Sequence, residues 1–539
     1  MKKARKCTIV LLGALLLGSL AACTTAGNQP AATTQVQSSR NGEADNLSAR
    51  ADDPYFSETS ENGRPSGSLI IATQNETPSI APAKHNAAAG SFKNVMTHNG
   101  LFRTNYYDLE PVPDLVASWE ALSDVLFKFT LHEGILFHNG DEMTAEDVVA
   151  SFYYVRQFPD TRASHLSAVA AEVVDRYTFT LYTGEPNAAL FSDLTLQGNF
   201  IMPKSLIESG HDFTTNPIGS GPFVFEEWRF GDFISFRAFE DYFDSERAAQ
   251  IENITWRIIP EGTSRTIALE AGEVDLVVEV PEPDVPRLLD NSDINVFMRE
   301  GAAYNMLLLN NSRPQFENIV VRQALNMAVD QEALVAVAFD GLAVPIREQV
   351  PIVFAGTSSE GVLPFDPEGA RALLLEHGID PESLAFDMIA STEERRRMGE
   401  VVQAQLAEIG IPTTITMMDH ATTIQRSLDG DYEAVFGMWS ASSLIPVIRG
   451  VYYGGIEGSP NRSRVDIPEL NELINLGIAT IDIDERNAIF EDVSRKVNQL
   501  VVNIPTHLPI TIRAFNSNLI APELNAVGGL NLNTVHWAQ

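Results

Sequence analysis

The sequence predicts an α/β fold with two or more lobes. The chain has 539 residues, which is more than one hydrophobic core ordinarily organises. Phe386–Ala390 and Ile411–Met417 have the pattern of strands, and they enclose a helix, Glu393–Ile409, that Gly410 caps. This alternation of strand, helix and strand is typical of a doubly wound sheet.

Composition limits the classes of partner. Apolar residues make up 44% of the chain, which suits a soluble globular body, and the formal net charge is −35. Such acidity argues against nucleic acid as a partner and against docking on anionic lipid by charge. Its simplest explanation is solubility, in a salty or alkaline habitat for example.

The N-terminus indicates export. A basic start is followed by an apolar run, Ile9–Leu20, that is too short to span a membrane as a stable helix. Leu20-Ala21-Ala22-Cys23 then resembles a lipobox, so residues 1–22 are expected to be a lipoprotein signal peptide and Cys23 the acylated residue. An ordinary signal peptide beside a chance cysteine is the alternative. Residues 23–65 are polar and read as a flexible tether.

Leu126–Arg156 is the most informative stretch. Its first residues alternate apolar and polar side chains, which predicts a half-buried strand. Asn139-Gly140 predicts a tight turn. Thr144 is a candidate N-cap for a helix with acids in its first turn.

Two motifs of this stretch, F-H-N-G and then T-A-E-D-V, resemble the signature of extracytoplasmic solute-binding proteins of peptide and nickel ABC importers (family 5, oligopeptide- and dipeptide-binding-protein-like). Further similar motifs follow in order from Gly67 to about Thr511, including NPIGSGPF at 216–223 and VRQAL at 321–325. The resemblance implies a two-lobed periplasmic-binding-protein-like fold (type II, cluster C), with mixed sheets flanked by helices and two hinge crossings.

The resemblance also implies a domain division. We expect lobe I at residues 66–302 with an inserted subdomain at about 106–210, lobe II at 303–505, and a return to lobe I at 506–539.

Several local elements are expected within these lobes. Val173–Tyr182 reads as one strand, and a single helix is expected from Ile319 through Phe339, in which Arg322 and Asp330 are structural polar groups. The glycines of 216–223 are expected to permit a tight turn.

The ligand site comes from the resemblance alone. It implies that Asn86 and Ala88 face the cleft and that Trp439 matches the cleft tryptophan of peptide binders. The family's aspartate, which pairs with the peptide ammonium, falls at Ser442 here. A buried ammonium without a counter-charge costs several kcal/mol, so the usual capture of a free peptide amine is not expected.

The remaining contacts are expected to be aromatic and hydroxyl groups, from Tyr304, Trp439, Ser440 and Ser442. The family's carboxylate-binding arginine falls at Ile389. Arg449 and the run at 395–397 are nearby in sequence, and they either serve an anionic group or are solvated helix residues.

An enzyme is not expected. The sequence has neither a Gly-x-Ser-x-Gly elbow nor a His-Glu-x-x-His motif, so no catalytic residue is assigned. His132 and His138 are weak candidates for metal ligands, and neither a metal nor a cofactor is expected.

The sequence therefore predicts a monomeric receptor, lipid-anchored on the outer side of a bacterial membrane, on the periplasmic side or the cell surface. It would capture a peptide or similar small solute between two lobes and deliver it to the transmembrane subunits of an ABC permease. An oligosaccharide or a metal chelate is the alternative ligand, and a sensor or chaperone-like surface receptor without transport is the alternative class. A neighbouring permease gene would separate transport from sensing.

Overall fold

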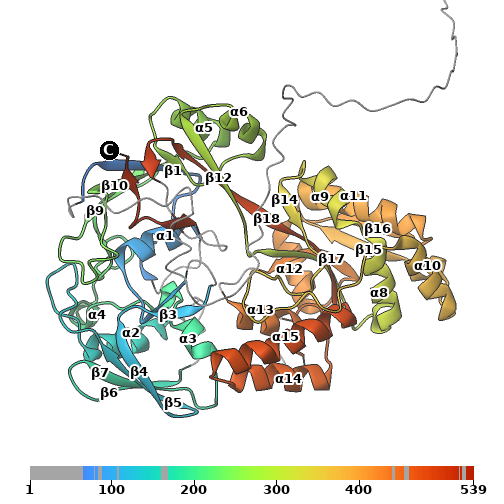
Figure 1. Cartoon of the computed structure of the whole chain (residues 1–539), viewed down its shortest axis with the longest axis horizontal. Helices are drawn as coiled ribbons and strands as arrows, with labels where there is room; N and C mark the ends of the chain where they lie inside the picture. The colour runs from blue at the N-terminus through green and yellow to red at the C-terminus, as the bar shows by residue number, and fades with distance from the viewer. Residues whose placement is uncertain are drawn as a thin grey trace, which may run out of the picture. The chain divides into compact units, whose positions relative to one another are not determined.

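Strand β18 (Asn503–Asn516) is shared by the two parts of one large mixed sheet (Figure 1). The computed structural model describes residues 65–77, 79–82, 88–105, 109–158, 168–439, 443–454, 461–520, 523–524 and 530–538. All of them belong to one compact unit, residues 54–539. The predicted signal peptide, Cys23 and the tether up to residue 64 lie outside the described residues.

The first part of the sheet surrounds a parallel core. Strand β1 pairs in parallel with β10 on one side and β11 on the other, and β9 and β8 continue antiparallel from β10. Strand β12 lies antiparallel to the second half of β18. The bounds are β1 Ser68–Thr73, β8 Phe223–Arg229, β9 Phe233–Ala238, β10 Asn253–Ile258, β11 Leu276–Val277 and β12 Ile294–Glu300.

The second part has its own parallel core. Strand β15 pairs in parallel with β16 and β17, while β13 is antiparallel to both β17 and the first half of β18. Strand β14 also pairs with β18. The bounds are β13 Tyr304–Leu309, β14 Ala343–Pro345, β15 Phe386–Ala390, β16 Thr413–Met417 and β17 Ala434–Trp439.

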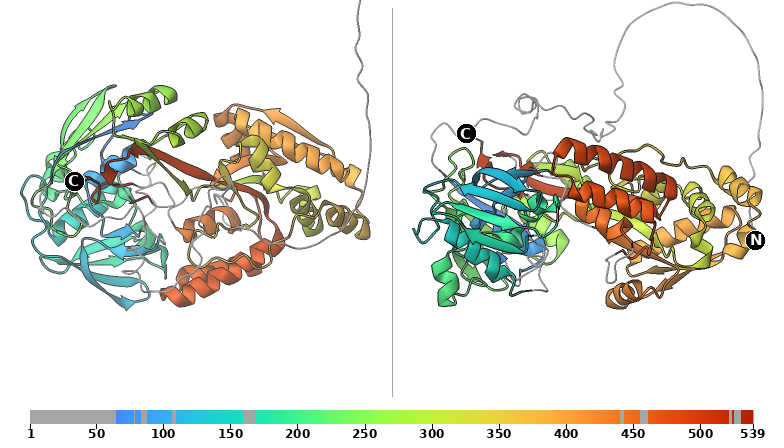
Figure 2. Two further views of the ribbon diagram at one scale, coloured as in Figure 1. Left: turned by 45° about the horizontal axis from the view of Figure 1, so that its top comes forward. Right: turned by 90° about the horizontal axis from the view of Figure 1, so that it is seen from below.

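Helices cover both faces of this second part of the sheet. Successive residues of a strand point to opposite faces, so neighbouring strand residues belong to different hydrophobic cores. Leu307 and Phe436 belong to one hydrophobic core with residues of α8, α10 and α11, whereas Leu308 and Val435 belong to another with residues of α13, α14 and α15. Helices α14 and α15 lie side by side, as the orange-red pair in Figure 2 shows. The bounds are α7 Pro314–Glu317, α8 Ile319–Ala328, α9 Gln331–Ala338, α10 Pro367–Glu376, η5 Pro381–Leu384, α11 Glu393–Glu408, α12 His420–Asp429, α13 Leu444–Tyr452, α14 Pro468–Ala479 and α15 Ile483–Leu500.

A separate four-stranded sheet, in the order β4-β5-β7-β6, carries the Leu126–Arg156 stretch. The predicted strand, turn and capped helix are confirmed there: Gly140 has a φ of +86°, and the Asp147 carboxylate accepts from the Thr144 N–H at 2.8 Å. The bounds are β2 Phe102–Thr104, β3 Pro111–Pro113, β4 Val116–Ser123, β5 Leu126–Leu131, β6 Ala170–Val173, β7 Thr178–Tyr182, α2 Ala145–Val155, α3 Ala189–Asp193, η3 Gln197–Asn199 and α4 Lys204–Ser209.

The remaining elements are short. They are α1 Ala88–Thr97, α5 Gly262–Glu270, η4 Glu282–Asp284, α6 Val285–Leu289, β19 Leu519–Ile520, β20 Glu523–Leu524, β21 Leu530–Asn531 and β22 His536–Trp537. Within the described residues, no helix has the length and apolarity that a membrane crossing needs.

Two elements expected from the sequence are divided in the structure. The expected strand Val173–Tyr182 contains the last residue of β6, a turn and β7, because the Asp175 carboxylate accepts from the Tyr177 and Thr178 N–H groups and closes the turn of a hairpin. The single helix expected from Ile319 is α8 followed by α9. Asp330 has an extended backbone and caps α9 by accepting from the N–H groups of Glu332 and Ala333.

The glycines of 216–223 serve close approach rather than a tight turn. A Cβ at Gly219 would overlap the Thr97 carbonyl, and one at Gly221 would overlap that of Met96. Gly219 and Gly221 both have negative φ. The expectation was therefore right about glycine and wrong about the reason, since backbone contact with the end of α1 requires it.

The two parts of the sheet are connected by residues 301–303, between β12 and β13, and by β18 itself. Asn503–His507 of β18 faces β13, and Ile510–Asn516 faces β12. The doubly connected α/β architecture expected from the sequence is present, and the lobe boundaries at 66, 303 and 506 remain predictions.

Candidate functional site

Trp439 is the last residue of β17, where that strand pairs with Tyr304 at the start of β13. Its indole lies directly against the backbone of α13, because a Cβ on Gly450 would overlap the indole ring. The indole of Trp439 can occupy this position only because residue 450 is a glycine. The helix and the indole form one wall of the candidate site.

Tyr304, expected as a ligand contact, is fully buried. Its hydroxyl lies beside that of Tyr452, which donates to the Gln349 carbonyl, and burial raises the pKa of both phenols. Tyr304 thus belongs to the hydrophobic core beneath β17 and presents no surface to a solute in this structure.

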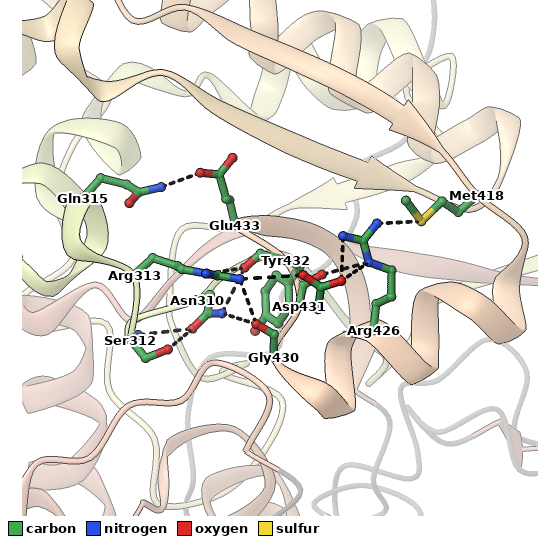
Figure 3. A network of polar contacts seen from close by, with 10 residues as sticks. All are labelled: Asn310, Ser312, Arg313, Gln315, Met418, Arg426, Gly430, Asp431, Tyr432 and Glu433. Carbon is green, nitrogen blue, oxygen red and sulfur yellow. Dashed lines mark hydrogen bonds and ion pairs between the residues drawn. The ribbon is translucent and has the colours of Figure 1, made fainter.

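A polar network fixes the beginning of β17 (Figure 3). The Asn310 amide donates to the carbonyls of Gly430 and Tyr432 at 3.0 and 2.9 Å, and Arg313 Nε donates to the same Tyr432 carbonyl at 3.1 Å. Asp431, in turn, is ion-paired with Arg426 at 3.0 Å. The strand that carries Trp439 is therefore tied at its start to the end of β13.

Two hollows flank α13. The first, named the Trp439 hollow, lies where β13 and β17 meet α13. The residues that line it are Met306, Leu308, Met438, Trp439, Gly450, Val451, Arg462 and Ser463.

The second, named the Glu110 hollow, brings the start of α13 together with β3 and α15. The residues that line it are Leu109, Glu110, Pro111, Ser192, Phe354, Ala355, Ser443, Leu444, Ile445, Arg486, Asn487 and Phe490. The Trp439 hollow is mainly apolar, whereas polar and apolar groups contribute about equally to the Glu110 hollow. Small-molecule sites commonly combine apolar walls with a few polar groups.

One charged pair spans the Glu110 hollow. Arg486 Nη2 lies 3.2 Å from Glu110 Oε2, and the two side chains are only 10% and 25% exposed. The Ser443 hydroxyl, at the N-cap of α13, is buried and has no hydrogen-bond partner within the described residues. This hollow therefore offers a solute a paired carboxylate and guanidinium and one free hydroxyl.

The other predicted site residues are placed as follows. Asn86, Ser440 and Ser442 lie outside the described residues, and Ala88 begins α1. Arg449 is exposed on α13. Their roles in binding remain predictions.

The arginines of α11 differ from one another. Arg396 is ion-paired with Glu393 and Glu400, as expected of a solvated helix residue. Arg395 donates to Ser391 Oγ at 2.8 Å, and burial lowers its pKa. His507 of β18 is buried, and burial together with the charge of Arg395 lowers its pKa to about 4.

Glu110, Ser443, Arg462 and Arg486 are among the polar residues of the hollows that were not identified from the sequence. Glu110 and Arg486 are 376 positions apart, so no local pattern relates them. Arg462 lies in the loop before α14, where charged residues are ordinary. Among the described residues there is no cluster of three or more His, Cys, Asp or Glu side chains that could hold a metal ion.

The fold and these hollows define a class: a two-lobed α/β receptor with two hollows beside a partly buried tryptophan. Residues 110–448 match the family of bacterial extracellular solute-binding proteins, family 5 (middle region). That match covers more than half of the chain, and the chain belongs to this family.

Curated relatives agree with this assignment. Heme-binding protein A of Haemophilus influenzae is 26% identical over 93% of this chain and 93% of its own length. Glutathione-binding protein GsiB of Salmonella paratyphi A is 28% identical over 70% of this chain and 75% of its own. The dipeptide-binding protein of Escherichia coli is 27% identical over 65% of this chain and 72% of its own.

Solved structures show the same fold. HbpA2 from Haemophilus parasuis superposes with a TM-score of 0.78 at 22% identity, covering 88% of this chain and 100% of its own. The periplasmic murein tripeptide-binding protein MppA, in its unliganded open form, also has a TM-score of 0.78, at 18% identity, with 88% of this chain and 97% of its own covered. The predicted two-lobed fold and family are therefore confirmed, and the chain is a solute-binding component of an ABC importer, a family of binding proteins rather than enzymes.

Proposed function

We propose that the solute is a short peptide or a peptide-like compound, held against Trp439 and α13. One observation carries this proposal: both hollows flank the same helix at the end of the strand that bears Trp439. A guest across α13 would have an indole at one end and the Glu110–Arg486 pair at the other. The names of relatives that bind dipeptides and glutathione support the same class of ligand.

The candidate site differs from that of common peptide binders in the residue expected to contact the amino group of the peptide. The position that resembles the family's ammonium-binding aspartate is Ser442. Glu110, the carboxylate of the Glu110 hollow, already has Arg486 as its partner. Recognition should therefore depend on the peptide backbone and on other groups of the solute more than on a free ammonium.

Lipid anchoring through Cys23, a monomeric state and a location on the outer side of a bacterial membrane complete the proposal. The anchoring and the location are supported by the signal-like N-terminus, with its basic start, apolar run and lipobox. Two or three acyl chains would hold the protein at the membrane durably.

Isothermal titration calorimetry tests the ligand class. Dipeptides, tripeptides and glutathione should bind the purified protein, and Trp439→Ala should weaken the best of them at least about tenfold, as expected for an aromatic anchor. Trp119→Ala is the matched control, because Trp119 is 41% exposed on β4 and lines neither hollow. Binding of oligosaccharides, heme or a metal chelate, with no response to any peptide, would contradict the proposal.

A further inference from the structure

The Trp439 hollow contains two hydrogen-bond donors that the described residues leave unused. Trp439 Nε1 and Arg462 Nε are both buried, and neither has a hydrogen-bond partner in the described part of the chain. A buried donor without an acceptor costs free energy. Apart from Ser463, the other side chains around them are apolar, namely Met306, Leu308, Met438 and Val451.

The charge of Arg462 also has no ion-pair partner among the described residues. No ion pair among the described residues includes Arg462, although many other arginines of the chain are paired with carboxylates. Burial lowers the pKa of its guanidinium, which reports the partial loss of water around the charge. A desolvated cation gains most from a nearby anion.

The backbone that carries Arg462 is held firmly. The Tyr432 hydroxyl donates to the Arg462 carbonyl, which joins this loop to the network of Figure 3. On either side, the Asn461 amide donates to the carbonyls of Tyr453 and Val465, and the Ser463 hydroxyl donates to Asn503 Oδ1 at 2.8 Å. The guanidinium is therefore presented from a fixed position, which favours specific recognition.

We propose that the Trp439 hollow binds a carboxylate group of the captured solute, with Arg462 as counter-charge and the Trp439 indole as a second donor. This assignment rests on the proposed function, because it names the chemistry of the solute at the same site. A guanidinium matches the geometry and charge of a carboxylate, and hydrogen bonds to charged groups are the strong ones. An ammonium would face a cation and a donor there and would be repelled.

The carboxylate has two sources in a peptide, an acidic side chain and the C-terminus. Four tripeptides separate them: Ala-Glu-Ala, Ala-Gln-Ala and the C-terminal amide of each. Calorimetry with the full-length protein should show that at least one carboxylate-bearing member binds about tenfold more tightly than its neutral counterpart. Loss of affinity on amidation would assign the C-terminus, and loss on changing Glu to Gln would assign the side chain.

Substitutions then test which residues of the hollow recognise the carboxylate. Arg462→Gln should abolish the preference for the carboxylate and leave the affinity for the neutral amide of Ala-Gln-Ala within about threefold. Trp439→Phe removes the N–H donor and keeps a smaller aromatic ring, and it should reduce the same preference in part. Arg464→Gln is the control, because Arg464 is exposed, donates to the Leu428 carbonyl and does not line the hollow, yet its loss changes the net charge equally.

The readout is the ratio of two affinities for one variant, so partial misfolding does not alter it. Should Arg462→Gln fail to fold, Arg462→Lys keeps the charge and lacks Nε, and it should lower the ratio. An unchanged ratio in the Arg462 variants, or equal binding of charged and neutral peptides by the unmodified protein, would overturn this assignment alone. Failure of all four tripeptides, of dipeptides and of glutathione to bind would overturn the proposed function together with it.

Discussion

Arg486 Nη2 lies 3.2 Å from Glu110 Oε2, so helix α15 is ion-paired with a residue 376 positions earlier in the chain. The pair belongs to the wall of the Glu110 hollow, and both side chains are largely shielded from water. It also accompanies a backbone hydrogen bond from the Ala188 N–H to the Ile478 carbonyl at 2.7 Å. These contacts join the segments of β3 and α3 to the helices that cover the second part of the sheet.

A double-mutant cycle on Glu110→Gln and Arg486→Gln should give a coupling free energy of about 1–2 kcal/mol in urea unfolding, between the values for exposed and buried pairs. The exposed pair Lys128–Glu120 is the control and should couple by less than about 0.5 kcal/mol. Equal coupling of the two pairs would mean that shielding from water contributes nothing here.

Gly450→Ala should displace the Trp439 indole, because the added methyl group would overlap its ring. We expect a loss of about 1–3 kcal/mol of unfolding free energy and weaker solute binding. Gly399→Ala, on α11, is the matched control: its nearest atom would be Ile415 Cδ1 at 3.2 Å, so its stability should change by less than about 1 kcal/mol. Identical behaviour of the two variants in urea unfolding and calorimetry would contradict the proposed packing.

Buried histidines should make the protein sensitive to mild acid. Burial lowers the pKa of His98 to about 3, that of His138 to about 4 and that of His507 to about 4. Because the unfolded histidines titrate near pH 6.5, the unfolded state binds more protons below that pH. Unfolding free energy should therefore be constant with respect to these groups above pH 7 and decrease by roughly 1 kcal/mol per pH unit for each histidine between pH 6 and 4.5.

His138→Gln provides the check on this pH dependence, since a glutamine amide can replace the hydrogen bond to the Gly221 carbonyl without titrating. The slope of unfolding free energy against pH should become shallower in this variant by roughly 1 kcal/mol per pH unit, the contribution of one histidine. A slope identical to that of the unmodified protein would show that His138 does not contribute.

Arg322→Met should be severely destabilising without affecting solute affinity of the folded protein. The Arg322 guanidinium is buried and donates to the carbonyls of Phe316, Glu317, Leu500 and Val501. Its removal leaves several buried acceptors unpaired, at a cost of about 3 kcal/mol or more in urea unfolding. The exposed Arg371→Met on α10 should stay within about 0.5 kcal/mol.

Local signals in the sequence predicted most elements correctly because those elements are determined by their own residues. Asp366 accepts from the Gly369 N–H with Pro367 at the first helical position, and Gly410 follows α11 with a φ of +91°. Arg322 and Asp330 are structural, as expected. The divided helix α8–α9 was missed because a cap inside an apolar pattern competes weakly with helical periodicity until the tertiary fold selects the break.

The site was less predictable, because it is assembled from distant segments. Trp439 was identified by resemblance, while Glu110, Arg462 and Arg486 reach the hollows only through the fold. The reason for Gly450 is equally non-local, since the indole that needs it belongs to the preceding strand. Burial of Tyr304 follows from its pairing with Trp439 at the covered end of the sheet, which the alternation of β13 does not reveal.

Native mass spectrometry of the protein, purified without added ligand and then denatured in the same instrument, tests the central claim most directly. We predict a bound compound at one copy per chain whose fragments identify a peptide or peptide-like molecule with at least one free carboxylate, and its loss in the Trp439→Ala variant. A carbohydrate or metal chelate in its place, or a peptide retained undiminished by Trp439→Ala, would contradict the account.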